Sequence, residues 1–188
     1  VDLKASLSAD GLIERWSHEL WANGYSSRPG RSSVSVLLAA PHLPHGKPAP
    51  VAINPPLAAG GGGERNAVPG YAFEHCSVIT HRLLDMPLRT SAMRALGGYA
   101  NVFAIECFMD ELAHQSGQDP LAFRLRHLRD PRAIDVLKTV VERCAWWQQP
   151  RAEGEQGPEP PMEDHREHSA SVASPGGRRA NPRCRRRS

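Results

Sequence analysis

Apolar and polar residues alternate with a period of two at the start of the chain. Leu3, Ala5 and Leu7 fall on one face of an extended strand, and Trp16 and Leu20 fall on one face of a second. Between them stands Asp10-Gly11, a pair that accepts the positive φ of a tight hairpin turn. The pattern predicts a β-hairpin over residues 1–23.

The middle of the chain has no regular pattern until about residue 71. Residues 24–70 are rich in Pro, Gly and Ser, with one short apolar run over residues 34–40. Proline removes backbone donors, which argues against a central strand or a helix here. A long irregular connection of this kind is typical of a segment that lies over other structure or forms a functional loop. Strand character returns from Tyr71 to Leu84.

Helical spacing dominates the next part of the chain. Val102, Ile105, Met109 and Leu112 recur every three or four residues, as on the buried face of a helix, and Gly117 suits the position after its last turn. Asp119-Pro120 and Asp130-Pro131 each combine an N-cap carboxylate with proline at the first helical position. The sequence therefore predicts three consecutive helices.

The composition changes abruptly after Trp147. No Leu, Ile, Phe, Trp or Tyr occurs between Arg151 and Ser188. Such a segment buries too little apolar surface to offset the conformational entropy of the chain, so disorder is expected. The predicted organisation is an α+β domain over residues 1–147, followed by a Pro/Glu/Arg-rich disordered tail over residues 148–188.

Charge and cysteine content narrow the function classes. The net charge is +3, and the basic residues crowd the tail as Arg178, Arg179, Arg183 and residues 185–187. No aromatic residue is interleaved with them for base stacking, which argues against specific nucleic-acid recognition. The four cysteines form no Cys-x-x-Cys pair, so isolated thiols are expected. No apolar run approaches the roughly 20 residues that span a bilayer, and no signal peptide opens the sequence.

Several motifs are too incomplete to carry chemistry alone. Gly60–Gly63 lacks the Gly-Lys-Ser/Thr ending of a phosphate-binding P-loop, so a flexible loop is expected. The histidine groups lack the four-ligand spacing of a structural zinc site, and a metal held directly by side chains is not expected. They are His42 with His45, His75 and Cys76 with His81, and His165 with His168.

The segment Ala92-Met-Arg-Ala-Leu-Gly-Gly98 is the most informative stretch before a predicted helix. Glycine lets the main chain approach a ligand closely, and amides at a helix N-terminus favour anionic groups. An ordinary helix entry capped by Asn101 explains the same residues equally well. On physical grounds alone, both interpretations stay open.

Several motifs of the sequence together resemble those of a known protein family. The residues that carry it are Arg65-Asn66-x-x-Pro69-x-Tyr71, Pro87–Gly98, Asn101–Ala113, Gly117–Leu128 and Asp130-Pro-Arg. Together, over about residues 1–147, they resemble the molybdenum-binding large subunits of the xanthine dehydrogenase and aldehyde oxidase family. The resemblance is greatest to the bacterial branch that includes isoquinoline 1-oxidoreductase and nicotinate dehydrogenase.

The resemblance implies a partial molybdopterin-binding domain. It places Ala92, Met93, Arg94, Gly97 and Gly98 against the molybdopterin cofactor, expected as the cytosine dinucleotide form, whose dithiolene carries the molybdenum. Members hydroxylate an aldehyde or N-heterocycle with oxygen from water. Electrons leave through a small iron–sulfur subunit, in some relatives towards a cytochrome c. Relatives occur in the cytoplasm and the periplasm, so the compartment stays open.

The departures from the family lie after Trp147. The family's general base is a glutamate in a far-downstream Gly-x-Gly-Glu motif, and nothing after Trp147 matches it. No catalytic residue is therefore assigned, and the chain alone is expected to be inactive. A frameshift is the hypothesis for the tail. The alternative function is a small non-enzymatic helical module whose basic tail binds nucleic acid or another polyanion.

Overall fold

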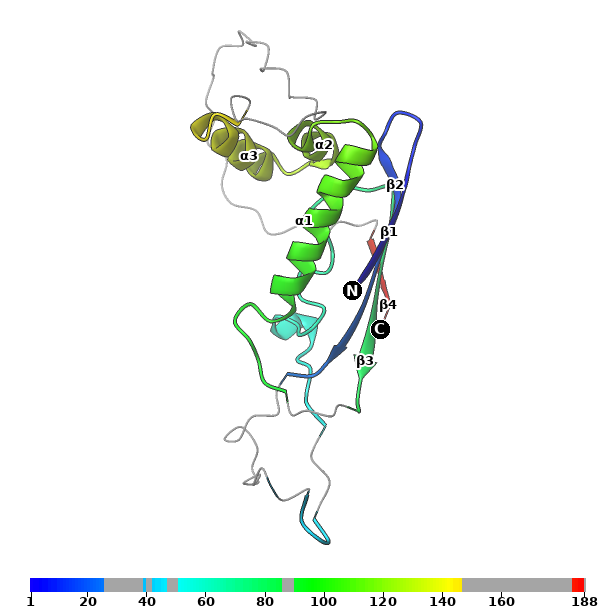
Figure 1. Cartoon of the computed structure of the whole chain (residues 1–188), viewed down its shortest axis with the longest axis vertical. Helices are drawn as coiled ribbons and strands as arrows, with labels where there is room; N and C mark the ends of the chain where they lie inside the picture. Colours follow the sequence, from blue (N-terminus) through cyan, green and yellow to red (C-terminus); the bar gives the residue numbers. More distant parts are fainter. Residues whose placement is uncertain (26–38, 40–41, 47–50, 86–89, 147–183, 188) are drawn as a thin grey trace.

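The protein combines one sheet with three α-helices, as the sequence predicts. A computed structural model describes residues 1–25, 39, 42–46, 51–85, 90–146 and 184–187, the last range by its backbone. The strands are β1 (Asp2–Leu7), β2 (Ile13–Asn23), β3 (His75–Leu83) and β4 (Cys184–Arg187), and the short 3₁₀ helix is η2 (Leu57–Ala59). The α-helices are α1 (Gly97–Gln115), α2 (Pro120–His127) and α3 (Pro131–Arg143) (Figure 1). The α+β class is confirmed.

The predicted N-terminal hairpin is present. β1 pairs antiparallel with β2 in a register that sets Asp2 opposite Glu19 and Leu7 opposite Ile13. Gly11 has φ 70°, the left-handed conformation that an Asp-Gly turn favours. His127 holds this hairpin to α2, since its Nε2 accepts a hydrogen bond from the Ile13 N–H at 2.9 Å.

The remaining strands extend the sheet in the order β1-β2-β3-β4. β3 lies parallel to β2, with Arg15 opposite His75 and Asn23 opposite Leu83, so residues 24–74 form the crossover between them. β4 pairs parallel with β3. The strand β4 departs from the sequence prediction, because it lies in the tail expected to be disordered. The rest of that tail lies outside the described residues.

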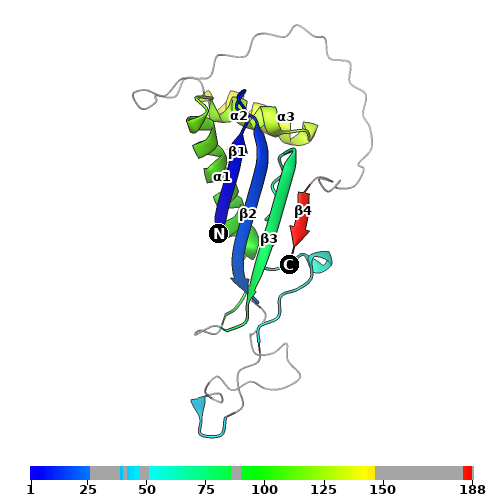
Figure 2. The ribbon, with the colours of Figure 1, turned by 90° about the vertical axis from the view of Figure 1, so that its right-hand side faces the viewer.

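The core lies between one face of the sheet and α1. Figures 1 and 2 show α1 along that face, with α2 and α3 at one end. Trp16 and Phe73 stack with their ring centroids 4.9 Å apart, and both are almost completely buried. From the helix side, Ile105, Met109 and Leu112 complete the core.

The face that α1 turns to the core differs from the predicted one. Val102 is 41% exposed and Phe103 is 68% exposed, although the apolar pattern placed Val102 inside with Phe103 beside it. The buried positions of the first two turns are instead Gly98 and Asn101. In these turns a glycine and a polar residue face the core. The apolar pattern therefore predicts the wrong buried face for the start of the helix.

The predicted starts of α2 and α3 are confirmed. Asp119 Oδ1 accepts hydrogen bonds from the N–H groups of Leu121 and Ala122, each at 3.0 Å. Asp130 Oδ1 accepts one from the Arg132 N–H at 3.0 Å. Gly117, with φ 64°, follows the end of α1 as predicted. Asn101 is not the N-cap of α1, because it lies inside the helix.

The cysteines follow the prediction only in part. Cys107 and Cys144 are exposed thiols, and the Cys144 thiol donates to Val141 O at 3.7 Å. Cys76 is disulfide-bonded, contrary to the expectation of isolated thiols. In the backbone register of β3 and β4, Cys76 lies opposite Cys184. Within the described ranges, no helix combines the length and the apolar character needed to cross a membrane.

Candidate functional site

The five residues expected to bind the cofactor lie together at the N-terminal end of α1. Ala92, Met93 and Arg94 form the loop that leads into the helix, and Gly97 and Gly98 are its first two residues. Met93 and Arg94 are exposed, whereas Gly98 is buried. At its other end the loop is attached to the sheet, because the Thr90 hydroxyl donates to the carbonyl oxygen of Gly24 at 2.8 Å.

The start of α1 has an unusual backbone. Leu96 occupies the N-cap position with φ 55° and ψ −136°, and no side chain caps the helix. Ala95 also has a positive φ of 69°. Residues with side chains rarely adopt such conformations, which cost about 1–3 kcal/mol each and persist only where surrounding contacts impose them.

This backbone leaves an amide group available at the positive end of the helix dipole. The Gly97 N–H donates to Gly62 O at 3.1 Å and the Gly98 N–H donates to Ala95 O at 3.0 Å. The N–H group of Tyr99 has no backbone acceptor among the described residues, and Tyr99 is exposed. The first turn contains no acidic side chain. An anion is the group that such a helix end favours.

The glycine-rich segment 60–63 packs against this helix end. A Cβ atom on Gly97 would lie 2.0 Å from the Gly63 carbonyl oxygen, and one on Gly63 would lie 2.4 Å from the Cβ of Ala22. Gly97 is therefore required by contact between two backbones, whereas the sequence suggested that it admits a ligand.

Side-chain hydrogen bonds fix the same segment, in contrast to the flexible loop expected there. Asn101 Nδ2 donates to Gly63 O at 2.7 Å and to Arg65 O at 2.9 Å. The Gly63 N–H donates to Asn54 Oδ1 at 3.2 Å, and Asn54 Nδ2 donates to Glu64 Oε2 at 2.8 Å. The result is a structured loop with defined side-chain directions.

That loop places Arg65 and Asn66 beside the start of α1. A Cβ on Gly98 would lie 3.9 Å from Arg65 Cγ and 3.8 Å from Asn66 Cγ. Both residues are exposed. Within the described part of the chain, neither Arg65 nor Arg94 forms an ion pair. In the sequence, Arg65-Asn66 stands out only as part of a family motif, since nothing local indicates contact with Gly98.

A buried histidine lies under the loop. His18 is fully buried, and its Nδ1 is 2.8 Å from the carbonyl oxygen of Ala67. Burial lowers the pKa of His18, and the positive N-terminal amino group lowers it further, against hydrogen bonds that raise it. The neutral ring therefore donates from Nδ1 to Ala67 and fixes the end of the loop.

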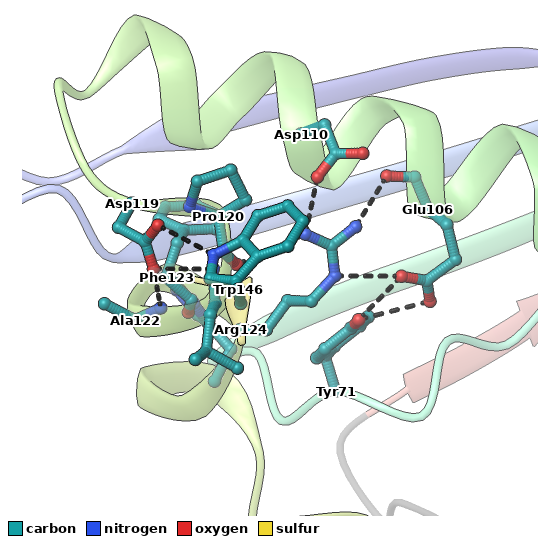
Figure 3. A network of polar contacts seen from close by, with 11 residues as sticks. Tyr71, Glu106, Asp110, Asp119, Pro120, Ala122, Phe123, Arg124 and Trp146 are labelled. Atoms are coloured by element: carbon teal, nitrogen blue, oxygen red, sulfur yellow. Dashed lines mark hydrogen bonds and ion pairs between the residues drawn. The ribbon is translucent and has the colours of Figure 1, made fainter. Parts of the chain in front are cut away.

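A second polar network joins the segments that carry the family resemblance (Figure 3). The Tyr71 hydroxyl donates to Glu106 Oε2 at 2.9 Å, and Arg124 Nε donates to the same oxygen at 3.1 Å. Arg124 also donates to Asp110 Oδ1 at 2.5 Å. Burial and the negative charge of Glu106 raise the pKa of Tyr71. These side chains tie the segment before β3 to α1 and α2, which is a structural role.

The histidine groups noted in the sequence are dispersed. His42, His45 and His75 are exposed, and His81 stacks on Trp21 with ring centroids 4.9 Å apart. Across the described residues, no group of three or more His, Cys, Asp or Glu side chains could hold a metal ion. His165, His168 and the tail arginines Arg178, Arg179 and Arg183 lie outside the described residues. The strand β4, which contains residues 185–187, is described by its backbone.

Comparison with known proteins identifies the domain. The family described as "Molybdopterin cofactor-binding domain" matches residues 62–128, which contain Gly62 and Gly63 of the glycine-rich segment, the predicted binding loop and helices α1 and α2. The B subunit of nicotinate dehydrogenase from Pseudomonas putida is 33% identical over 146 residues, covering 78% of this chain and 11% of that protein. The beta subunit of isoquinoline 1-oxidoreductase from Brevundimonas diminuta is 40% identical over 55 residues, covering 29% of this chain and 7% of that protein.

The match covers only a small part of each relative. The chain spans about a tenth of the length of these curated relatives. Its matched residues 62–128 include the loop Ala92–Leu96 and the first turn of α1, but not β2, Asn54, Gly60 or Gly61. The predicted family is confirmed: the chain belongs to the molybdopterin-binding subunits of molybdenum oxidoreductases, of which it contains part of the cofactor-binding domain.

Proposed function

We propose that the loop Ala92–Leu96 and the first turn of α1 form one wall of a molybdopterin site. The observation that carries this proposal is the uncapped start of α1, where the Tyr99 amide lacks a backbone acceptor among the described residues. Molybdopterin carries a phosphate group, which is the kind of anion that helix N-termini bind. The residues present therefore fit the cofactor.

The five predicted residues have different parts in this proposal. Arg94 supplies a positive charge, and Ala92 and Met93 present exposed or half-buried surface in the same loop. Gly98 keeps the inner side of the first turn free of a side chain, and Gly97 allows the glycine-rich segment to approach. When bound, the cofactor supplies molybdenum held by dithiolene sulfur and hence the redox chemistry.

The intact subunit is proposed to hydroxylate an N-heterocycle with oxygen from water. Two relatives are named for the N-heterocyclic compounds nicotinate and isoquinoline, which supports this substrate class over an aldehyde. We further propose the cytosine dinucleotide form of the cofactor, a small iron–sulfur subunit as electron acceptor and, beyond it, a cytochrome c. The described residues supply no assigned general base, so this chain alone is proposed to be inactive.

Cofactor content tests the proposal directly. The 188-residue chain is purified from bacteria that make molybdopterin, and bound pterin is released, oxidised with iodine and measured by its fluorescence. Arg94→Gln is compared with Arg132→Gln, which removes an exposed arginine from the start of α3. We expect pterin in the wild type and Arg132→Gln, and about tenfold less in Arg94→Gln, as for loss of one charged hydrogen bond. A wild-type chain without pterin would contradict the proposal.

A further inference from the structure

We propose that Arg65 binds a phosphate group of the cofactor and that Asn101 positions Arg65 for this role. This inference rests on the proposed function and adds residues that the five-residue prediction does not contain. Arg65 follows the glycine-rich segment and lies 33 positions before Gly98, so the site is assembled from two distant parts of the chain.

The surroundings of Arg65 favour an anion. Its Cγ packs near the position that a Cβ on Gly98 would occupy, at 3.9 Å, and the side chain is exposed. No carboxylate of the described residues pairs with it. The Tyr99 amide, which has no backbone acceptor among the described residues, lies on the turn that Gly98 begins. A guanidinium and helix N-terminal amides are complementary donors to phosphate oxygens.

Asn101 determines where Arg65 stands. Its side chain is 1% exposed and donates to the carbonyl oxygens of Gly63 and Arg65, at 2.7 and 2.9 Å. Because Asn101 belongs to α1, these bonds attach the backbone of Arg65 to the helix that carries the Tyr99 amide. On the far side of Arg65, His18 holds the Ala67 carbonyl at 2.8 Å. The backbone is thus held on both sides of Arg65, whereas the Arg65 side chain is exposed.

Asn66 supports the same arrangement. It adopts φ 58°, a left-handed conformation that asparagine tolerates better than most residues. This bend directs its side chain towards Gly98, where Asn66 Nδ2 would lie 3.9 Å from an added Cβ. The amide of Asn66 is exposed beside Arg65 and offers a second, uncharged donor.

Binding of inorganic pyrophosphate to the full 188-residue chain tests the role of Arg65. Affinity is measured by NMR titration for the wild type, Arg65→Gln, Arg65→Lys and the control Arg132→Gln. We expect Arg65→Gln to weaken binding about tenfold, the size of one charge-assisted hydrogen bond. Arg65→Lys should retain part of the affinity because the charge remains. The control should bind as the wild type does.

A double-mutant cycle separates positioning by Asn101 from a purely structural role. Asn101→Ala is combined with Arg65→Gln, at a temperature where circular dichroism shows every variant folded. If Asn101 positions Arg65, loss of Arg65 weakens pyrophosphate binding much less in the Asn101→Ala background than in the wild type. Additive effects of the two substitutions would overturn the positioning role.

The outcomes distinguish this inference from the proposed function. If the wild type carries molybdopterin and Arg65→Gln leaves both cofactor content and pyrophosphate affinity unchanged, the assignment of Arg65 is overturned and the proposed function stands. If the wild type carries no molybdopterin yet binds pyrophosphate through Arg65, the proposed function is overturned and the anion site stands. Weakening by Arg132→Gln equal to that by Arg65→Gln would show non-specific attraction and overturn the site.

Discussion

The starts of the three helices differ in how their backbone amides are satisfied. At α2 and α3, Asp119 and Asp130 accept bonds from first-turn amides, and a proline follows each of them. At α1, Leu96 offers no side-chain acceptor, and the backbone there is held by contacts with residues 62–66. Local sequence thus completes α2 and α3, whereas distant residues shape the start of α1, where the Tyr99 amide has no backbone acceptor among the described residues.

The largest expected effect comes from adding one methyl group where α1 meets the glycine-rich segment. Gly97→Ala would place a Cβ 2.0 Å from the Gly63 carbonyl oxygen, so the backbones must separate. We expect a loss of about 3 kcal/mol or more in the free energy of unfolding, at the upper end for overpacking. Urea denaturation measures it.

Gly98→Ala is the matched control for this substitution. A Cβ at Gly98 would meet Asn66 and Arg65 at ordinary contact distances of 3.8 and 3.9 Å. Alanine is the better helix former by about 1 kcal/mol, so the stability of this variant should equal or exceed that of the wild type. Equal destabilisation by both substitutions would show that the close approach at Gly97 does not shape the start of α1.

Mild acid should lower the free energy of unfolding, because two buried histidines, His18 and His127, hold distant segments beside α1 and α2. Burial is the main cause that lowers the pKa values of His18 and His127 below the ordinary 6.5, and Arg126 lowers that of His127 further. Above pH 6.5 both histidine rings are neutral in the folded and in the unfolded chain. As pH falls below 6.5, the unfolded chain gains protons that the folded chain does not, so stability decreases until the folded pKa values are passed.

Urea unfolding at pH 8 and at pH 5.5 measures this loss. His127 donates from Nδ1 to Phe123 O at 2.7 Å and accepts at Nε2 from the Ile13 N–H, a pattern that only the neutral ring provides. The variant His18→Gln/His127→Gln should show a smaller difference between the two pH values. Equal or greater stability of the wild type at pH 5.5 would contradict the conclusion that both buried rings are neutral in the folded protein.

Removal of a local cap should have a moderate effect. Asp119→Ala deletes the acceptor of the Leu121 and Ala122 amides and should cost about 1 kcal/mol of unfolding free energy. The substitution should leave pyrophosphate affinity unchanged, because Asp119 caps α2 and accepts from Trp146 Nε1 at 3.4 Å, and neither group belongs to the start of α1. A drop in pyrophosphate affinity with no drop in stability would mean that the start of α2 also takes part in anion binding.

The smallest expected effect is a gain in stability. Leu96→Gly removes the side chain from a residue with φ 55°. Relief of that strain, of about 1–3 kcal/mol, exceeds the roughly 0.5–1 kcal/mol entropic cost of glycine, so thermal unfolding should occur at a slightly higher temperature. A clear loss of stability would instead assign Leu96 an essential packing role at the start of α1.

Features coded by neighbouring residues could be predicted from the sequence. Asp119-Pro120, Asp130-Pro131, Gly117 and Asp10-Gly11 each form the cap or turn that their chemistry favours. The fold class and the family also followed, because many weak motifs occur in the expected order. The location of the loop Ala92–Arg94 before α1 was predicted as well, whereas its contact with the cofactor stays a prediction.

Features formed by distant residues could not be predicted in this way. Asn101 matches an N-cap in sequence, yet it serves as a buried donor to carbonyls 36 and 38 positions away. Val102 and Phe103 carry the apolar pattern but face outwards, since Gly98 and Asn101 occupy the inner face. The contact of Arg65 with Gly98 and the parallel pairing of β2 with β3 likewise depend on tertiary structure.

The most direct test of the account is an NMR titration of the ¹⁵N-labelled chain with pyrophosphate, followed at individual backbone amides. We predict that the Tyr99 resonance shifts most, because its amide has no backbone acceptor among the described residues. The Leu121 and Ala122 resonances should stay in place, since Asp119 already accepts hydrogen bonds from both amides. Shifts spread evenly over the three helix starts, or none at Tyr99, would contradict the claim that the start of α1 is an anion-binding site.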